Sequence, residues 1–420
     1  MARFPMLTAT ALSLVLAAPL AAQDRSAVLT TYADIALAGY EDSLTTARAL
    51  DAAVAALVAA PSPETLAAAR DAWRAARIPY QQTEVFRFGN PIVDDWEGRV
   101  NAWPLDEGLI DYTAGDYLGA NDENPFAALN IIATPVLAIA GQTVDATTIT
   151  PALLADLHEL DGIEANVTTG YHAIEFLLWG QDLNGTGPGA GDRPPTDFVQ
   201  GPGCTGGNCD RRVAYLTAAT TLLQSDLQEM VTAWAADGAA RAAVMADESA
   251  GLTAMLTGMG SLSYGELAGE RMRLGLLLND PEEEHDCFSD NTHMSHFLNA
   301  QGIRNVWTGR YARVDGSVIE GPSLAVLVAG ADAGLAADLT ARIDATMDAM
   351  TALVAAAEGG MPFDMMLAPG NEAGATLIMA GVNALIDQTR GIERAAAALG
   401  LGQIALEGSD SLDDPAAVLQ

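Results

Sequence analysis

The chain has 420 residues, half of them hydrophobic, which is enough for two or three domains with large cores. It carries 55 acidic and 20 basic residues, a net charge of −35, and all of the basic residues are arginine. The absence of lysine excludes Schiff-base and phosphate-loop lysine chemistry. No nucleic-acid partner is expected, because such binding depends on neutralising phosphates with cations. The acidic excess favours solubility and is compatible with cation binding.

Residues 1–22 are typical of a secretory signal peptide. The start is positively charged, Leu7–Leu16 is largely apolar, and the small residues Ala21 and Ala22 precede Gln23. The apolar run is shorter than the roughly 20 residues of a membrane span, and no later run is long enough, so no transmembrane span is expected. We therefore expect export to the periplasm or the extracellular space, with or without peripheral attachment to the cell envelope.

Ala-rich segments with helical spacing dominate the rest of the chain, and alternating β-branched runs are nearly absent. Leu324, Val328 and Leu335, for example, recur at the spacing of a core-facing stripe. These patterns predict an all-α fold of antiparallel helix bundles. The predicted helices cover residues 25–59, 63–88, 151–179, 211–236, 264–278, 323–357 and 373–399.

Three stretches do not fit a regular helix: residues 89–116, 181–210 and 281–310. Long ordered loops of this kind usually carry function. The second stretch is rich in glycine and proline and suggests a domain boundary. We therefore predict two helical-bundle domains, residues 23–200 and 201–420.

Cys204 and Cys209 lie close together in the second stretch, and Cys287 stands alone. In an exported protein such a pair predicts a disulfide. A two-cysteine metal site is the alternative, but no further Cys or His lies nearby in the sequence. Cys287 is expected to be a free buried thiol.

His172 and Glu175 are the sharpest local feature. Residues three apart lie on one face of a helix, and an imidazole beside a carboxylate can ligate a metal or relay a proton. The alternative is a hydrogen-bonded pair that orders the core. Phe176 stands where both the zinc-protease motif and its inverted form need a second histidine, so a metal would need ligands from other helices.

Glu84 is the predicted third metal ligand or base. Trp73, Arg77, Tyr80 and Glu84 recur at four, three and four residues on one helix face, and Arg77 would hold Glu84 charged. A surface Arg–Glu pair is the alternative. If Glu84 lies elsewhere, the expected partners of the histidine pair are Arg77 and Asp106.

Two further polar sets are candidates for lining the site. Glu266 and Glu270 lie on a stripe that suits either structural salt bridges or site lining. His293 and His296 lie three apart and could chelate a cation, or the segment from Asp290 to His293 could hold a loop by side-chain to backbone bonds. His285 follows Glu282 at the E-x-x-H spacing of di-iron bundles, but those sites need two copies and the sequence has one.

The segment G-x-H-x-x-E at residues 170–175 is the signature of the imelysin-like family, which this chain resembles. Trp73–Gly89 (WRAARIPYQQTEVFRFG) and Asn101–Tyr112 (NAWPLDEGLIDY) are similar to segments of that family. SLSYGELAGERM, DPEEEHDCFSDNTH and a GRY ending at Tyr311 resemble its iron-regulated protein A-like branch. The resemblance implies two helical bundles, a location outside the cytoplasm and a link to iron acquisition.

Three functions remain open on this basis. The first is an exported metal-binding protein with iron or zinc, divalent or ferric, at His172, Glu175 and Glu84, and with other envelope iron-uptake components as partners. The second is a metal-dependent peptidase of the imelysin type, for which no catalytic residue can be named. The third is a structural or partner-binding helical protein.

Overall fold

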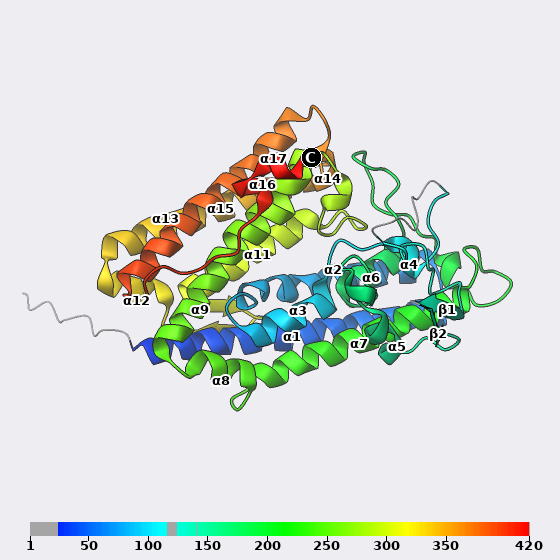
Figure 1. The fold of residues 1–420 in the computed structure, drawn as a ribbon, viewed down its shortest axis with the longest axis horizontal. Coiled ribbons are helices and arrows are strands. Elements are labelled where there is room, and N and C mark those ends of the chain that lie inside the picture. The colour runs from blue at the N-terminus through cyan, green and yellow to red at the C-terminus, as the bar shows by residue number, and fades with distance from the viewer. Residues whose placement is uncertain (1–23, 116–123, 140, 420) are drawn as a thin grey trace, which may run out of the picture.

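The computed structural model describes residues 24–115, 124–139 and 141–419, so the predicted signal peptide at residues 1–22 lies outside the described residues. The described chain is predominantly helical, which confirms the predicted all-α class (Figure 1). None of the described helices combines the length and the apolar character that crossing a bilayer requires. The strands of the described chain form two short antiparallel pairs, β1 (Val136–Ile139) with β2 (Gln142–Asp145) and β3 (Arg310–Ala312) with β4 (Val318–Glu320).

One layer of helices is built around α1 (Arg25–Ala59), which packs along α2 (Pro63–Gln81) and α7 (Cys209–Trp234) (Figure 1). Ser62 caps α2 and Pro63 occupies its first position, as helix starts favour. The other helices of this layer are α3 (Pro91–Asn101), α4 (Glu107–Ile110), α5 (Pro151–Leu157), α6 (Gly170–Trp179), α8 (Ala239–Met245) and the 3-10 turns η1 (Glu84–Phe86), η2 (Leu160–Gly162) and η3 (Pro195–Phe198).

A second layer is formed by α13 (Ala333–Glu358) and α15 (Glu372–Ala398), which pack side by side at the upper left of Figure 1. One long continuous helix packs against α15, and its middle segment is a π-helix. This helix consists of α9 (Glu248–Ser261), the π-helix η4 (Leu262–Leu274) and α10 (Gly275–Leu278). The remaining elements are η5 (Pro281–Glu283), α11 (Thr292–Thr308), α12 (Leu324–Ala331), α14 (Phe363–Leu367), α16 (Asp410–Asp413) and α17 (Pro415–Val418).

The hydrophobic core crosses the boundary predicted between residues 200 and 201. One large cluster of buried side chains runs from Val28 in α1 to Ile404 near the C-terminus, and it includes most of the inward face of α7. A smaller cluster around Met350 and Leu367 lies within the second layer. The division into residues 23–200 and 201–420 stays a prediction.

Several predicted helices are wrong in their extent, among them the one predicted over residues 63–88, which ends at Gln81. The helix predicted over residues 151–179 is two helices, since residues 158–169 form a loop in which Glu159 and Asp161 have positive φ. The helix predicted over residues 323–357 breaks at Asp332, whose side chain accepts a hydrogen bond from the Leu335 amide at 2.9 Å and caps α13. Conversely, α3 and α11 lie in stretches that the sequence did not predict as helical.

The predicted disulfide between Cys204 and Cys209 is confirmed, with the two Cα atoms 5.9 Å apart. It closes the Gly- and Pro-rich stretch at the start of α7. Cys287 is free, as predicted, and it is half-buried rather than fully buried.

Candidate metal centre

Helix α6 carries His172 and Glu175 into the interior, and every one of its residues is buried. Gly170 opens the helix with a φ of 78°, and a Cβ there would lie 2.4 Å from the carbonyl oxygen of Val100. Only glycine permits both the backbone conformation and this close approach to α3. The Tyr171 carbonyl accepts a hydrogen bond from Trp73 Nε1 at 2.9 Å, which ties α6 to α2.

His172 and Glu175 form a direct hydrogen bond, with Nδ1 and Oε2 2.9 Å apart. The other carboxylate oxygen of Glu175 accepts from the amide and the hydroxyl of Ser289, at 3.0 and 2.6 Å. Burial raises the pKa of Glu175 and lowers the pKa of His172, so it disfavours charge on both. The Nε2 atom of His172 is buried and has no hydrogen-bond partner among the described residues.

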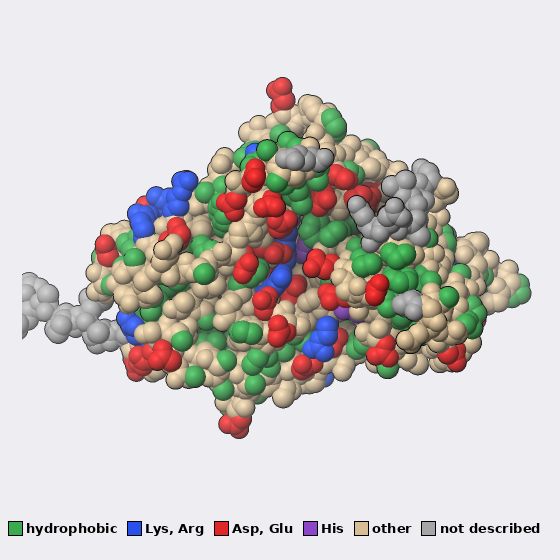
Figure 2. All heavy atoms as spheres, in the orientation of Figure 1, with side chains coloured by type: hydrophobic (Ala, Val, Ile, Leu, Met, Phe, Trp, Pro, Cys, Tyr) green, Lys and Arg blue, Asp and Glu red, His purple; other side chains and the backbone are tan. Residues whose placement is uncertain are grey.

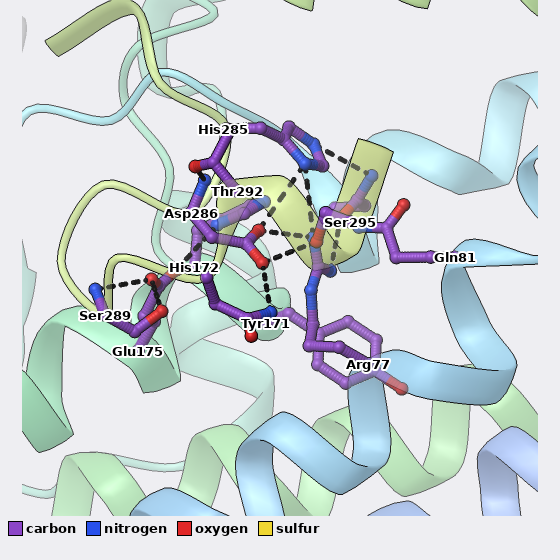
Figure 3. A network of polar contacts seen from close by, with 12 residues as sticks. Arg77, Gln81, Tyr171, His172, Glu175, His285, Asp286, Ser289, Thr292 and Ser295 are labelled. Atoms are coloured by element: carbon purple, nitrogen blue, oxygen red, sulfur yellow. Dashed lines mark hydrogen bonds and ion pairs between the residues drawn. The ribbon is translucent and has the colours of Figure 1, made fainter. Parts of the chain in front are cut away.

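His285 and Asp286 complete a group around His172. The two imidazole rings meet edge to face with centroids 4.8 Å apart. One possible ligand atom from each of His172, His285 and Asp286 lies within 4.8 Å of the other two, and all three residues are buried (Figure 3). Two imidazoles and a carboxylate are a donor set that borderline metals such as iron and zinc accept.

The protonation states of this group suit a metal. Burial lowers the pKa of His285, as it does that of His172, so both rings are neutral near pH 7. Burial alone would raise the pKa of Asp286, but Arg77 and the hydrogen bonds from Ser295 and Asn291 outweigh it and lower the pKa to about 2. Neutral imidazoles and an ionised carboxylate are the forms that bind a metal.

Arg77 lies against the same group from α2. It donates to Asp286 Oδ1 at 2.8 Å and to Asn101 Oδ1 at 2.6 Å, and it lies 3.3 Å from His285 Nδ1. With the bonds from Asn291 and Ser295, Asp286 accepts three hydrogen bonds, whereas a carboxylate has about four acceptor sites. A cation could therefore share Asp286 with Arg77, and in the tautomer with its proton on Nδ1 the His172 ring offers a free lone pair at Nε2.

A pocket of about 500 Å³ reaches His285 and Asn101 and contains eight carboxylates against two arginines, Arg87 and Arg271. Figure 2 shows acidic side chains gathered across the middle of one face, with histidine visible between them. Clefts lined by one sign of charge concentrate counter-ions. The acidic lining residues are Asp94, Asp95, Glu97, Glu159, Glu164, Glu266, Glu270 and Glu283.

The structure places Glu84 in a buried ion pair with Arg271, at 2.7 Å, and not with Arg77 as expected. Arg271 also donates to Glu266 at 2.9 Å and to Asn299 at 2.8 Å. Glu84 is not part of the group formed by His172 with its two neighbours. Glu266 and Glu270 line the acidic pocket, and Glu266 also serves the salt-bridge role that was the alternative.

Asp106, Asp290 and His293 are not members of the His172 group. Asp106 accepts a hydrogen bond from the side chain of Asn124. Asp290 lies with Asp182 and Asp364 in a separate cluster of carboxylates. His293 is half-buried at the start of α11, and its Nδ1 atom has no hydrogen-bond partner among the described residues.

His285 and Asp286 are the site residues that sequence reasoning missed as ligands. His285 was noted only for its E-x-x-H spacing, and Glu282 is exposed and lies outside the group. Asp286 carries no spacing signal, because Arg77, the arginine that pairs with it, lies 209 residues away in the chain. The family-like motif DPEEEHDCFSDNTH was the signal that could have drawn attention to both.

The family model Imelysin (Peptidase_M75) matches residues 36–392. The chain belongs to the Imelysin family. Among relatives, Iron-regulated protein A of Synechococcus elongatus is 45% identical over 47 residues, which make up 11% of this chain and only 13% of that protein. This Imelysin member also shares its fold with the crystal structure of a protein described as an iron-regulated protein A precursor, from Parabacteroides distasonis. The match has a TM-score of 0.64 and 22% identity and covers 91% of this chain and 97% of that one.

Proposed function

We propose that this Imelysin protein is an exported metal-binding protein of iron handling, with His172, His285 and Asp286 as ligands. The observation that carries the proposal is the buried His172 Nε2 atom, which has no partner among the described residues. Burying such a polar atom without a partner costs free energy. A metal ion held also by His285 and Asp286 would remove that cost.

Glu175 acts in this proposal as a positioning residue and not as a ligand. Histidine ligands commonly donate their second ring N–H to a carboxylate, which fixes the tautomer and the ring orientation. Glu175 is placed for that role, since Ser289 holds one of its oxygens and His172 Nδ1 contacts the other. A cation at Nε2 would favour the tautomer in which Nδ1–H donates to the Glu175 carboxylate.

Iron in its ferrous form is the proposed metal, with zinc as the competitor. Two histidines and one carboxylate are the ligand set of non-haem Fe(II) sites, and zinc accepts a similar set. The name of the Synechococcus relative refers to regulation by iron, which supports iron handling as the setting. Envelope components of iron uptake are the corresponding partners.

The peptidase alternative is supported by the family description, which names a peptidase. His172, Glu175 and Asp286 are all at most 1% exposed, however. A polypeptide substrate could not reach a metal at these buried side chains in the described conformation. This conformation therefore favours metal binding over peptide hydrolysis. A metal-loaded protein that cleaves a peptide library, with cleavage lost in His172→Ala, would favour the peptidase instead.

Metal titration of the metal-free protein with Fe²⁺ under anaerobic conditions, and separately with Zn²⁺, tests the proposal. We expect one site in the wild type, loss of that site in His172→Ala and in His285→Ala, and about 10–100-fold weaker binding in Glu175→Gln. Isothermal calorimetry and metal analysis after gel filtration both measure this.

His158→Ala is the matched control, because His158 is a partly buried histidine bonded to the Gly98 carbonyl and outside the His172 group. It should bind metal as the wild type does. Thermal melting of each variant establishes that it is folded. Unchanged stoichiometry and affinity in folded His172→Ala and His285→Ala would reject these residues as ligands.

A further inference from the structure

A second group of metal-type ligands lies outside the proposed iron centre and consists of carboxylates alone. Oxygens of Asp182, Asp290 and Asp364 lie within 4.8 Å of one another. Asp182 follows α6, Asp290 directly precedes the start of α11, and Asp364 lies in α14. The three segments are far apart in sequence, so the cluster joins parts of both helical layers.

Asp364 is aimed into this cluster without hydrogen-bond partners. It is 2% exposed, and neither of its carboxylate oxygens has a hydrogen bond of good geometry with a described residue; the backbone amides of Met365 and Asp364 itself lower its pKa only in part. One oxygen of Asp290 is likewise buried and without a partner. Buried carboxylates of native proteins are usually paired, so the unpaired Asp364 carboxylate with an unpaired oxygen of Asp290 beside it indicates a missing positive partner.

The arginine near the cluster interacts with other side chains. Arg74 is the arginine whose charge acts on Asp290. Its guanidinium pairs with Asp71 at 3.4 Å and lies over the Trp179 ring at 5.0 Å from the centroid. Glu284 adds a fourth buried carboxylate, on which the charges of Asp182, Asp290 and Asp364 act, and one of its oxygens has no hydrogen-bond partner among the described residues.

Burial and mutual repulsion both act on the pKa values of the cluster. Burial, reinforced by the neighbouring carboxylates, raises the pKa of Asp290 to about 7 and that of Asp364 to about 6. Either protons or a cation must therefore offset the charge near neutral pH. A cation also satisfies the lone pairs of all three residues at once, which a single proton cannot do.

We propose that Asp182, Asp290 and Asp364 form a binding site for Ca²⁺ that is separate from the iron centre. The ligands are all carboxylate oxygens, which hard cations prefer, and no imidazole or thiolate belongs to the cluster. Ca²⁺ fits better than Mg²⁺ because it accepts irregular geometry from loops, whereas Mg²⁺ demands a near-ideal octahedron. The ion ties the loop that carries His285 and Asp286 to α14 and to the segment after α6.

Calorimetric titration of the full chain with CaCl₂ in about 0.15 M NaCl, which screens the acidic surface, measures this site. We expect one saturable site with a dissociation constant of about 0.1–1 mM, the range of extracellular calcium modules. Asp364→Asn and Asp290→Asn should each weaken binding by at least about tenfold. The calcium-induced rise in melting temperature should shrink in parallel.

Asp348→Asn removes the same charge from an exposed position on α13 and should leave Ca²⁺ binding unchanged. His172→Ala should retain it too, which separates this site from the iron centre. If Asp364→Asn does not fold, Asp290→Asn decides, because Asp290 is only half-buried. A wild type without saturable binding up to about 10 mM Ca²⁺, binding that survives both cluster variants, or tighter binding of Mg²⁺ than of Ca²⁺ would overturn the proposal.

Discussion

Glu107 is buried in the first turn of α4, where the Gln181 side chain donates to it at 3.1 Å. Burial and the nearby carboxylates of Glu282 and Asp106 raise its pKa from 4.5 to about 8. Between these two values the unfolded chain has lost a proton that the folded protein still binds. Glu107 therefore lowers the free energy of unfolding as the pH rises through this window.

Glu107→Gln should remove this dependence, because the amide is uncharged at every pH. We expect the free energy of unfolding of the variant, relative to the wild type, to increase between about pH 5 and pH 8 by up to about 1.4 kcal/mol per pH unit. Urea denaturation at several pH values measures it. Glu358→Gln, at an exposed position in α13, corrects for the loss of one charge. A difference between wild type and Glu107→Gln that stays constant across the window would contradict the argument.

At the residue scale, the sequence could predict contacts within one helix and not those between distant segments. His172 and Glu175 meet because residues three apart share a helix face. Arg77 and Glu84 were paired by the same rule, but α2 ends at Gln81 and Glu84 lies in a 3-10 turn, so the helical spacing no longer applies. Arg77 pairs instead with Asp286, 209 residues away, which no local pattern indicates.

At the scale of elements, Gly170 determines how closely α6 packs against α3. Gly170→Ala should destabilise the protein by about 2–4 kcal/mol, because alanine is strained at a φ of 78° and its Cβ would clash with the Val100 carbonyl. The loss should be visible in thermal or urea denaturation, and metal binding by His172 should weaken with it. Gly330→Ala is the control, since Gly330 lies in α12 with open space around its Cα, and we expect no loss of stability there. Equal stability of the two variants would show that the approach of α6 to α3 is not tight.

The sequence predicted those helices best whose ends carry local signals. α1 spans the predicted residues 25–59, with the Asp24 side chain accepting from the Ser26 amide at its start. The break between α5 and α6 contains a turn signal that helical periodicity does not register, the dipeptide Asp161-Gly162, in which both residues have positive φ. It is held by tertiary contacts, such as the bond from Thr168 Oγ1 to the Leu154 carbonyl at 2.7 Å and that from Thr169 Oγ1 to the Arg99 carbonyl at 2.8 Å. Periodicity cannot reveal contacts of this kind, so one long helix was predicted there.

At the scale of the whole molecule, the sequence predicted helical bundles but not how the two layers share a core. The boundary near residue 201 was placed from composition, since glycine and proline gather there. Yet α7, which follows it, packs along α1. Which helices pair depends on the complementary shapes of their faces, and a single sequence does not display these.

Two buried polar side chains of the first layer have partners that come late in the chain. Arg77 is 0% exposed and pairs with Asp286, and Glu175, also 0% exposed, accepts both hydrogen bonds from Ser289. During synthesis from the N-terminus, the first layer therefore cannot complete its core until residues 285–295 have been made. A buried arginine without its carboxylate is strongly destabilising. Residues 24–245 alone should thus form an expanded helical state that binds a hydrophobic dye and melts without cooperativity. A cooperative melt of this fragment would show that the first layer folds independently. If the fragment melts without cooperativity, the group around His172 assembles among the last steps of folding. A chaperone would then bind the protein while the core around Arg77 and Glu175 is still exposed.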